Sequence, residues 1–147
     1  MTTPTQSALN DEEIDDFLAR HQTAVLSLSN DSEPYAIPVT YRFDPDTRRF
    51  YFRLVFAPSS EKLQFLPDVP PARLVVYEEA APEFGSVIAV GQPEELSRSE
   101  IVAEQVAQFG QTSRPLFEMW EDSKDNLDVR LFELDPDRLT GRQITTE

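Results

Sequence analysis

Apolar and polar residues alternate with a period of two along several stretches of this chain, which is the pattern of half-buried β-strands. Residues 35–43 show it most clearly, because Tyr35, Ile37, Val39 and Tyr41 all fall on one face. A DPDT turn follows this stretch and joins it to the next as a hairpin. The pattern predicts strands over residues 23–29, 35–43, 48–56, 72–79 and 86–96, and two more around the later DPD turn.

Apolar residues spaced three and four apart predict a small number of helices. Asn10 and Glu13 form a capping-box pattern before the first helix, and Gly110 follows the apolar stripe of the second. The predicted helices cover residues 10–20, 97–110 and 115–123, and a shorter one begins at Ser59 and Ser60 and ends by Pro67.

Six or seven strands with few helices indicate a mainly β fold with helices (α+β), built as a small barrel with the helices packed on it. Residues 1–8 are polar and are expected to be a flexible N-terminus. Residues 9–147 contain no linker or repeat and are expected to form a single domain.

The charge balance of the chain narrows its partners. The chain has 27 acidic and 13 basic residues, a formal net charge of −14 and no cysteine. We expect no nucleic-acid and no membrane partner, because both would require a basic surface. No secretion signal and no apolar run of about 20 residues is present, so a cytoplasmic location is expected. Acids spread along the whole chain, with lysine only at Lys62 and Lys124, indicate adaptation to a salt-rich cytoplasm.

Several chemistries lack their residues. Four glycines cannot provide a dinucleotide-binding or P-loop motif, and the single histidine, His21, cannot form a metal site or a catalytic triad with any recognisable motif. We therefore predict no metal and assign no catalytic residue. If the chain is an enzyme, a bound cofactor is expected to carry the reaction.

The stretch RFYFRLVFAPSSEKLQF, residues 49–65, offers a candidate anion site. Arg53 interrupts the outward face of a strand, and Ser59, Ser60 and Lys62 lie at the expected helix start, where free N–H groups favour an anion. A solvent-facing arginine and plain capping by serine are the alternative interpretations.

Pro38 lies in the middle of a predicted strand, although proline cannot donate to a strand ladder. A broken ladder would leave backbone groups at Val39 and Thr40 for a flat heterocycle with alternating donors and acceptors. The alternative is a simple edge proline.

Together these stretches, with SVIAVGQPEEL and LDPDRLTGR, resemble the FMN-binding split-barrel family, which is related to pyridoxamine 5′-phosphate oxidase. The resemblance implies a six-stranded split β-barrel, a homodimer with FMN between the subunits, and an oxidoreductase that transfers hydride through the flavin to an unknown substrate. It implies isoalloxazine contacts from Pro38, Val39, Thr40 and Tyr41. It implies phosphate contacts from Arg53, Ser59, Ser60 and Lys62, and suggests Gln92 and Trp120 for contacts across the dimer.

The chain also departs from that family. It lacks the substrate-phosphate arginines of the true oxidase, and its APSS loop lacks the common glycine, so vitamin B6 oxidation is not expected. The alternatives are a reductase dependent on the deazaflavin F420, whose acidic tail would require more positive charge, and a non-catalytic flavin or haem binder.

The acidic composition yields a first prediction. Repulsion among the carboxylates is screened in molar salt and grows when salt is removed, so the fold should lose stability. The melting temperature measured from molar to millimolar salt should fall steadily. A melting temperature that stays flat over this range would contradict the adaptation to salt.

Overall fold

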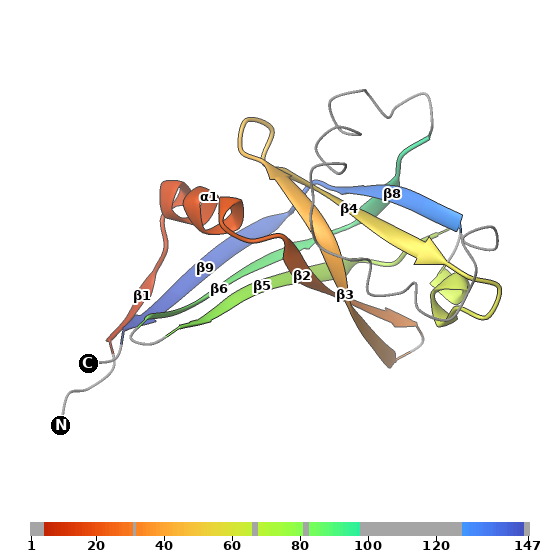
Figure 1. Cartoon of the computed structure of the whole chain (residues 1–147), viewed down its shortest axis with the longest axis horizontal. Coiled ribbons are helices and arrows are strands. Elements are labelled where there is room, and N and C mark those ends of the chain that lie inside the picture. Colours follow the sequence, from red (N-terminus) through yellow and green to blue (C-terminus); the bar gives the residue numbers. More distant parts are fainter. Residues whose placement is uncertain (1–4, 31, 66–67, 81–82, 98–127, 146–147) are drawn as a thin grey trace.

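The structure, a computed structural model, describes residues 5–30, 32–65, 68–80, 83–97 and 128–145. The predicted helices 97–110 and 115–123, with Trp120 and Lys124, fall outside these residues apart from Ser97. The described elements, drawn in Figure 1, are β1 (Thr5–Ala8), α1 (Asp11–Ala19), β2 (Thr23–Asn30), β3 (Glu33–Asp44), β4 (Arg49–Phe56), the 3-10 helix η1 (Glu61–Phe65), β5 (Ala72–Ala80), β6 (Glu83–Gly91), β7 (Pro93–Glu95), β8 (Asp128–Leu134) and β9 (Arg138–Thr145).

All described strands belong to one antiparallel sheet with the order β1-β9-β6-β5-β2-β3-β4-β8-β7. β3 pairs with β2 over Glu33–Thr40 but with β4 only from Tyr41 onwards. The sheet therefore divides at Tyr41 into two parts that only β3 connects. In Figure 1, β9, β6 and β5 run side by side below α1, whereas β4 and β8 form a separate layer.

The mainly β fold with few helices is confirmed, but the described residues form nine strands rather than six. β1 lies within the segment expected to be flexible and pairs with β9 through Thr5–Ala8. Its sequence TQSA has no apolar alternation, so periodicity could not reveal it. The predicted strand 86–96 divides at Gln92, because β6 pairs with β5 and β9 while β7 pairs with β8.

The core lies between the two parts of the sheet and under α1. Phe52 and Phe132, on the paired strands β4 and β8, are fully buried with ring centroids 5.7 Å apart. α1 begins at the predicted capping box and buries Ile14, Phe17 and Leu18. At Gly85 on β6, a Cβ atom would lie 2.7 Å from the ring of Phe17, so only glycine lets the helix approach this closely.

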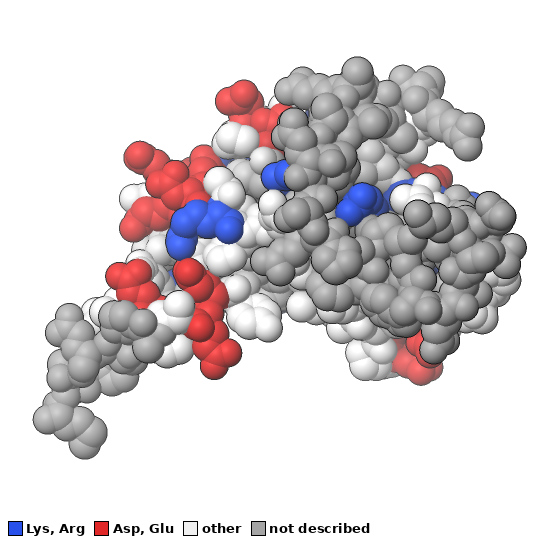
Figure 2. Space-filling view, viewed as in Figure 1, with Lys and Arg blue, Asp and Glu red and all other residues white. Residues whose placement is uncertain are grey.

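Charged side chains cover the outside of this core. Figure 2 shows acidic residues gathered over α1 and over the tip of the β3–β4 hairpin. Some of them pair with arginine, as Asp15 does with Arg48 at 2.6 Å and Glu133 with Arg49 at 2.8 Å. Exposed pairs of this kind contribute about 0–1 kcal/mol each, so the apolar core supplies most of the stability. No helix within the described residues is long and apolar enough to cross a membrane.

Tyr41 connects several elements at the point where the sheet divides. Its hydroxyl donates to the Leu18 carbonyl at the end of α1 (2.7 Å), and its backbone N–H donates to the Gln22 carbonyl (3.0 Å). Its ring lies 6.0 Å from that of Phe50 on β4. Burial raises the pKa of the Tyr41 phenol, an effect that the nearby charge of Arg42 partly offsets.

We predict that Tyr41→Phe lowers the free energy of unfolding by about 0.5–1.5 kcal/mol, because the short bond from the Tyr41 hydroxyl is lost and the Leu18 carbonyl keeps only the longer bond from the His21 N–H (3.4 Å). Tyr77→Phe is the matched control, since Tyr77 is 62% exposed. Urea unfolding at neutral pH measures both.

The same pair of proteins should differ in pH dependence. The folded-state pKa of Tyr41 is raised, so its contribution is present below the unfolded pKa of about 10 and is lost as pH rises above it. The difference between wild type and Tyr41→Phe should therefore shrink above about pH 10. A Tyr41→Phe protein as stable as Tyr77→Phe would contradict this role.

Candidate functional site

Pro38 lies in the part of β3 that pairs with β2 on one edge and with no described strand on the other. Its Cα partner is Val25 on β2, and the pairing with β4 begins three residues later at Tyr41. A residue without an N–H can occupy this position because no ladder bond from that residue is required there. The edge of β3 opposite β2, between Pro38 and Tyr41, is therefore where backbone groups can contact a ligand.

Side chains in this stretch alternate between the core and the outside. Val39 and Tyr41 are buried in the apolar core, at 2% and 1% exposure. Only the backbone of these two residues could contact a ligand. Pro38 and Thr40 project from the opposite face, where Pro38 is exposed and Thr40 is buried.

Thr40 carries a buried hydroxyl that needs a partner. The residue is 3% exposed, and its Oγ1 has no hydrogen-bond partner within the described part of the chain. The same holds for Thr23 Oγ1 on β2, and the two residues are Cα partners. Buried polar atoms are nearly always satisfied, so two neighbouring hydroxyls lack the partner that they are expected to have among the described residues.

A hollow of about 390 Å³ is lined by Thr23 but not by Thr40. Its lining includes apolar side chains from β2, β3 and β5, the exposed ring of Tyr77 and the polar residue Thr23. Mixed apolar and hydrogen-bonding walls suit a flat aromatic ligand. The described residues that line this hollow are His21, Gln22, Thr23, Ala24, Val25, Pro38, Val75 and Tyr77.

Arg53 extends the site across the division of the sheet. Phe52 pairs with Tyr41, and both face the core, so Arg53 and Thr40 project from the same outward face of neighbouring strands. Arg53 is half-buried, and this burial lowers the pKa of its guanidinium. An arginine stays charged at neutral pH in proteins, so the site contains a partly desolvated cation.

Ser59 and Ser60 form a turn rather than the start of an α-helix. The Ser60 hydroxyl accepts from the Ala57 N–H (2.8 Å), and the Ser60 N–H donates back to the Ala57 carbonyl (3.0 Å). Ser59 is exposed. The helix that follows is a five-residue 3-10 helix, and the anion role of Ser59 and Ser60 at its start stays a prediction.

Lys62 is buried, at 6% exposure, in this 3-10 helix. Its Nζ lies 5.9 Å from the centroid of the Phe56 ring, and Arg130 on β8 lies over the same ring at 5.5 Å. Phe56 projects into the core whereas Arg53 projects outward. The structure thus places Pro38, Thr40 and Arg53 on one face, and Lys62 with Arg130 at the end of β4.

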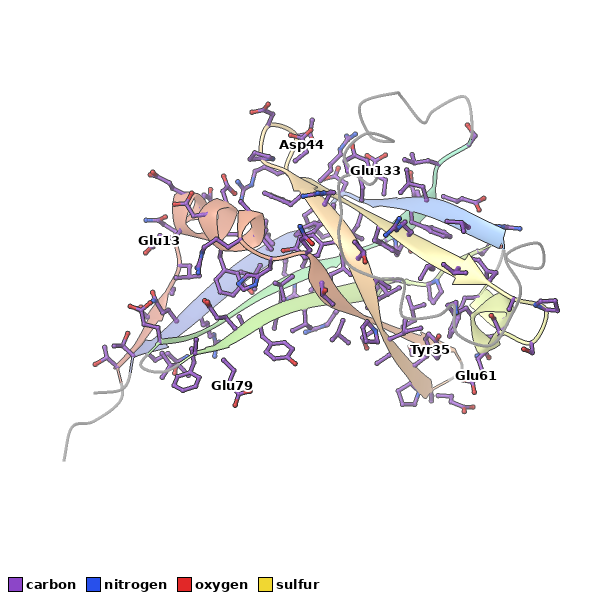
Figure 3. The ribbon with its side chains drawn as sticks, viewed as in Figure 1. Glu13, Tyr35, Asp44, Glu61, Glu79 and Glu133 are labelled. Carbon is purple, nitrogen blue, oxygen red and sulfur yellow. The ribbon has the colours of Figure 1, made fainter. Side chains whose placement is uncertain are left out.

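The remaining predicted residues have other surroundings. Gln92 donates from its side-chain amide to the Val69 carbonyl. η1 is held at the start of β3, where the rings of Tyr35 and Phe65 are 5.5 Å apart, and Figure 3 shows Tyr35 near Glu61 at this end of the molecule. No group of histidine and acidic residues that could hold a metal occurs within the described ranges.

Sequence reasoning missed Thr23 and Arg130. Thr23 enters the site through the β2–β3 register, in which it faces Thr40. Nothing in its own neighbourhood marks it. Arg130 interrupts the apolar pattern of β8, as Arg53 does in β4, and that interruption could have identified it.

The profile of the family described as pyridoxamine 5′-phosphate oxidase matches residues 10–143, and the chain belongs to this family. A FAD-binding protein from Mesorhizobium loti is similar in structure, with a TM-score of 0.69, 17% identity, and coverage of 97% of this chain and 99% of that one. The FAD-binding protein from Mycobacterium smegmatis is similar with a TM-score of 0.67 and 16% identity, over 96% of this chain and 100% of that one. The FAD- and haem-binding protein from the same organism is similar with a TM-score of 0.61 and 18% identity, over 97% of this chain and 73% of that one. No curated protein matches the chain.

The orphaned hydroxyl yields a prediction. Thr40→Val keeps the shape of the side chain but removes the unsatisfied polar atom, so the ligand-free protein should gain about 1 kcal/mol of stability. Thr47→Val, in an exposed turn, is the control and should change little. Denaturant unfolding of both variants measures the effect. A loss of stability in Thr40→Val would show that a protein group already satisfies this hydroxyl.

Proposed function

We propose that this protein binds a flavin on the outward side of β3, and that FMN is the form it takes. The observation that carries the proposal is the buried Thr40 hydroxyl, which has no hydrogen-bond partner among the described residues. It lies where β3 pairs with β2 but not yet with β4, and the half-buried Arg53 projects from the same face. Family membership and the FAD-binding proteins of similar fold support the class of cofactor.

The residues fit the two parts of such a cofactor. Thr23, Thr40 and the backbone near Pro38 offer donors and acceptors for the edge of a flat heterocycle, over an apolar wall. Arg53 on the outward face offers positive charge for a phosphate, and Lys62, whose ammonium lies at the Phe56 ring on the other face of β4, is the second proposed contact. Such charge is required because the chain as a whole has a net charge of −14.

A bound flavin would supply hydride or electron transfer. This chain's own residues would bind and orient it, and no acid–base residue is assigned. One chain would leave a ligand on this outward side half exposed, so the proposal includes a homodimer in which the second subunit covers the ligand. The proposal also includes a salt-rich cytoplasm as the location of the protein.

A non-catalytic flavin or haem binder is the second candidate. The observation in its favour is the similarity of fold to a protein that binds both FAD and haem. Turnover of a nicotinamide donor with bound flavin would favour the oxidoreductase, and bound flavin without turnover would favour the binder.

We predict that Lys62→Ala weakens FMN binding by about 1.5–3 kcal/mol, the range for a hydrogen bond to a charged group. Riboflavin lacks the phosphate and should lose much less affinity. Quenching of flavin fluorescence on titration with protein measures both ligands.

Lys124→Ala is the matched control, because it removes the only other lysine of the chain from an acidic stretch, EDSKDN. It should leave both affinities nearly unchanged. Equal losses for FMN and riboflavin in Lys62→Ala, or no loss for either, would exclude the phosphate role of Lys62.

A further inference from the structure

Three arginines of this acidic protein have no acidic partner among the described residues. Arg73, Arg138 and Arg142 are exposed and form no ion pair and no side-chain hydrogen bond in the part of the chain that the structure describes. The described arginines that do pair with a carboxylate are Arg20, Arg48, Arg49 and Arg130.

The strand register places these three arginines on one face. Val90 on β6 is the Cα partner of both Arg73 on β5 and Arg138 on β9, so the two arginines flank it. Arg142 faces Ser86 on the same two strands. Their sequence neighbours, such as Leu74 and Gly141, are buried, so the arginines project away from the core.

Carboxylates are nearly absent from this outer face. Along β9, β6, β5 and β2, the outward positions of the described strands contain one acid, Glu79, which lies towards the end of the sheet opposite Phe84. The whole chain has 27 acids, so the face is selectively free of them. An arginine cluster without neighbouring acids produces a local positive potential that attracts anions.

These side chains surround a hollow of about 450 Å³, which we call the arginine hollow. Ile88 and Val90 are half-buried and form an apolar floor, while Ser86 and Thr140 add hydroxyl groups. Its size is in the range of small-molecule sites. The described residues that line it are Arg73, Ser86, Ile88, Val90, Arg138, Thr140, Gly141 and Arg142.

We propose that the arginine hollow binds a small molecule with an apolar body and an anionic group, a phosphate or a carboxylate. Arg73 and Arg138 are two strands apart, about 10 Å between Cα atoms, so both guanidinium groups can approach one anion from opposite sides. The body of the ligand lies on Ile88 and Val90. This site is separate from Arg53 and Lys62, and the proposal does not rest on flavin binding.

The test uses 1-naphthyl phosphate, 1-naphthoate and neutral 1-naphthol as probes, titrated into the full chain at one fixed salt concentration. Wild type should bind the phosphate or the carboxylate more tightly than naphthol, and the stronger of the two identifies the anion. Arg73→Gln combined with Arg138→Gln should weaken the anionic probes at least tenfold, because two charged hydrogen-bonding groups are lost. Naphthol binding should change less than twofold.

Arg49→Gln removes the same charge from an exposed arginine outside the hollow and should leave all three probes within twofold of wild type. Equal losses in Arg49→Gln and the double variant would mean that only net charge matters and would overturn the proposal. Naphthol bound as tightly as the anions, or no binding of either anion, would also overturn it. Loss of probe binding in Lys62→Ala, with the double variant unaffected, would assign the probes to the flavin site instead.

Discussion

The whole arrangement depends on one strand that serves two parts of the sheet. β3 pairs with β2 over Glu33–Thr40 and with β4 only from Tyr41 onwards, so no described strand pairs with its second edge over Pro38 to Thr40. Tyr41 fixes this division, because its hydroxyl bonds to the end of α1 and its backbone N–H to the chain just before β2. The candidate site exists because β2 holds one edge of β3 in place while no described strand pairs with the other edge before Tyr41.

The acidic residues are distributed unevenly over the surface of the described residues. Acids cover α1 and the β3–β4 hairpin, where several pair with arginine, but the outward positions of β9, β6, β5 and β2 contain only Glu79. A ligand with a phosphate or carboxylate would meet repulsion over most of this protein. The candidate anion positions, at Arg53, at Lys62 and in the arginine hollow, lie where arginine or lysine replaces that negative field.

Local sequence patterns were sufficient for most of the fold. The alternation of Tyr35, Ile37, Val39 and Tyr41 identified β3, and the capping box at Asn10 identified α1. β1 escaped prediction because TQSA has no apolar residue except Ala8, and tertiary pairing with β9 alone holds it in the sheet. The sequence pattern also missed the break between β6 and β7. Nothing in the residues Gly91, Gln92 and Pro93 indicated that the chain changes its strand partners there.

Contacts between distant residues were harder to predict. The proline in β3 pointed to an irregular ladder, and the strand pattern placed Arg53 outside the core, both from local sequence. The register between strands places Thr23 opposite Thr40. It also places Val90 between Arg73 and Arg138. Local sequence patterns do not specify this register. The burial of Lys62 beneath Phe56 depends on how η1 folds back, which a five-residue pattern does not specify.

The central claim is that the outward side of β3 holds a flavin, and the absorption spectrum of the protein purified in high salt tests it most directly. We expect the visible bands of a protein-bound flavin, and denaturation followed by chromatography should release FMN rather than FAD. Release of FAD would correct the form of the cofactor but keep the site. A colourless protein that also fails to bind added FMN or FAD would contradict the account.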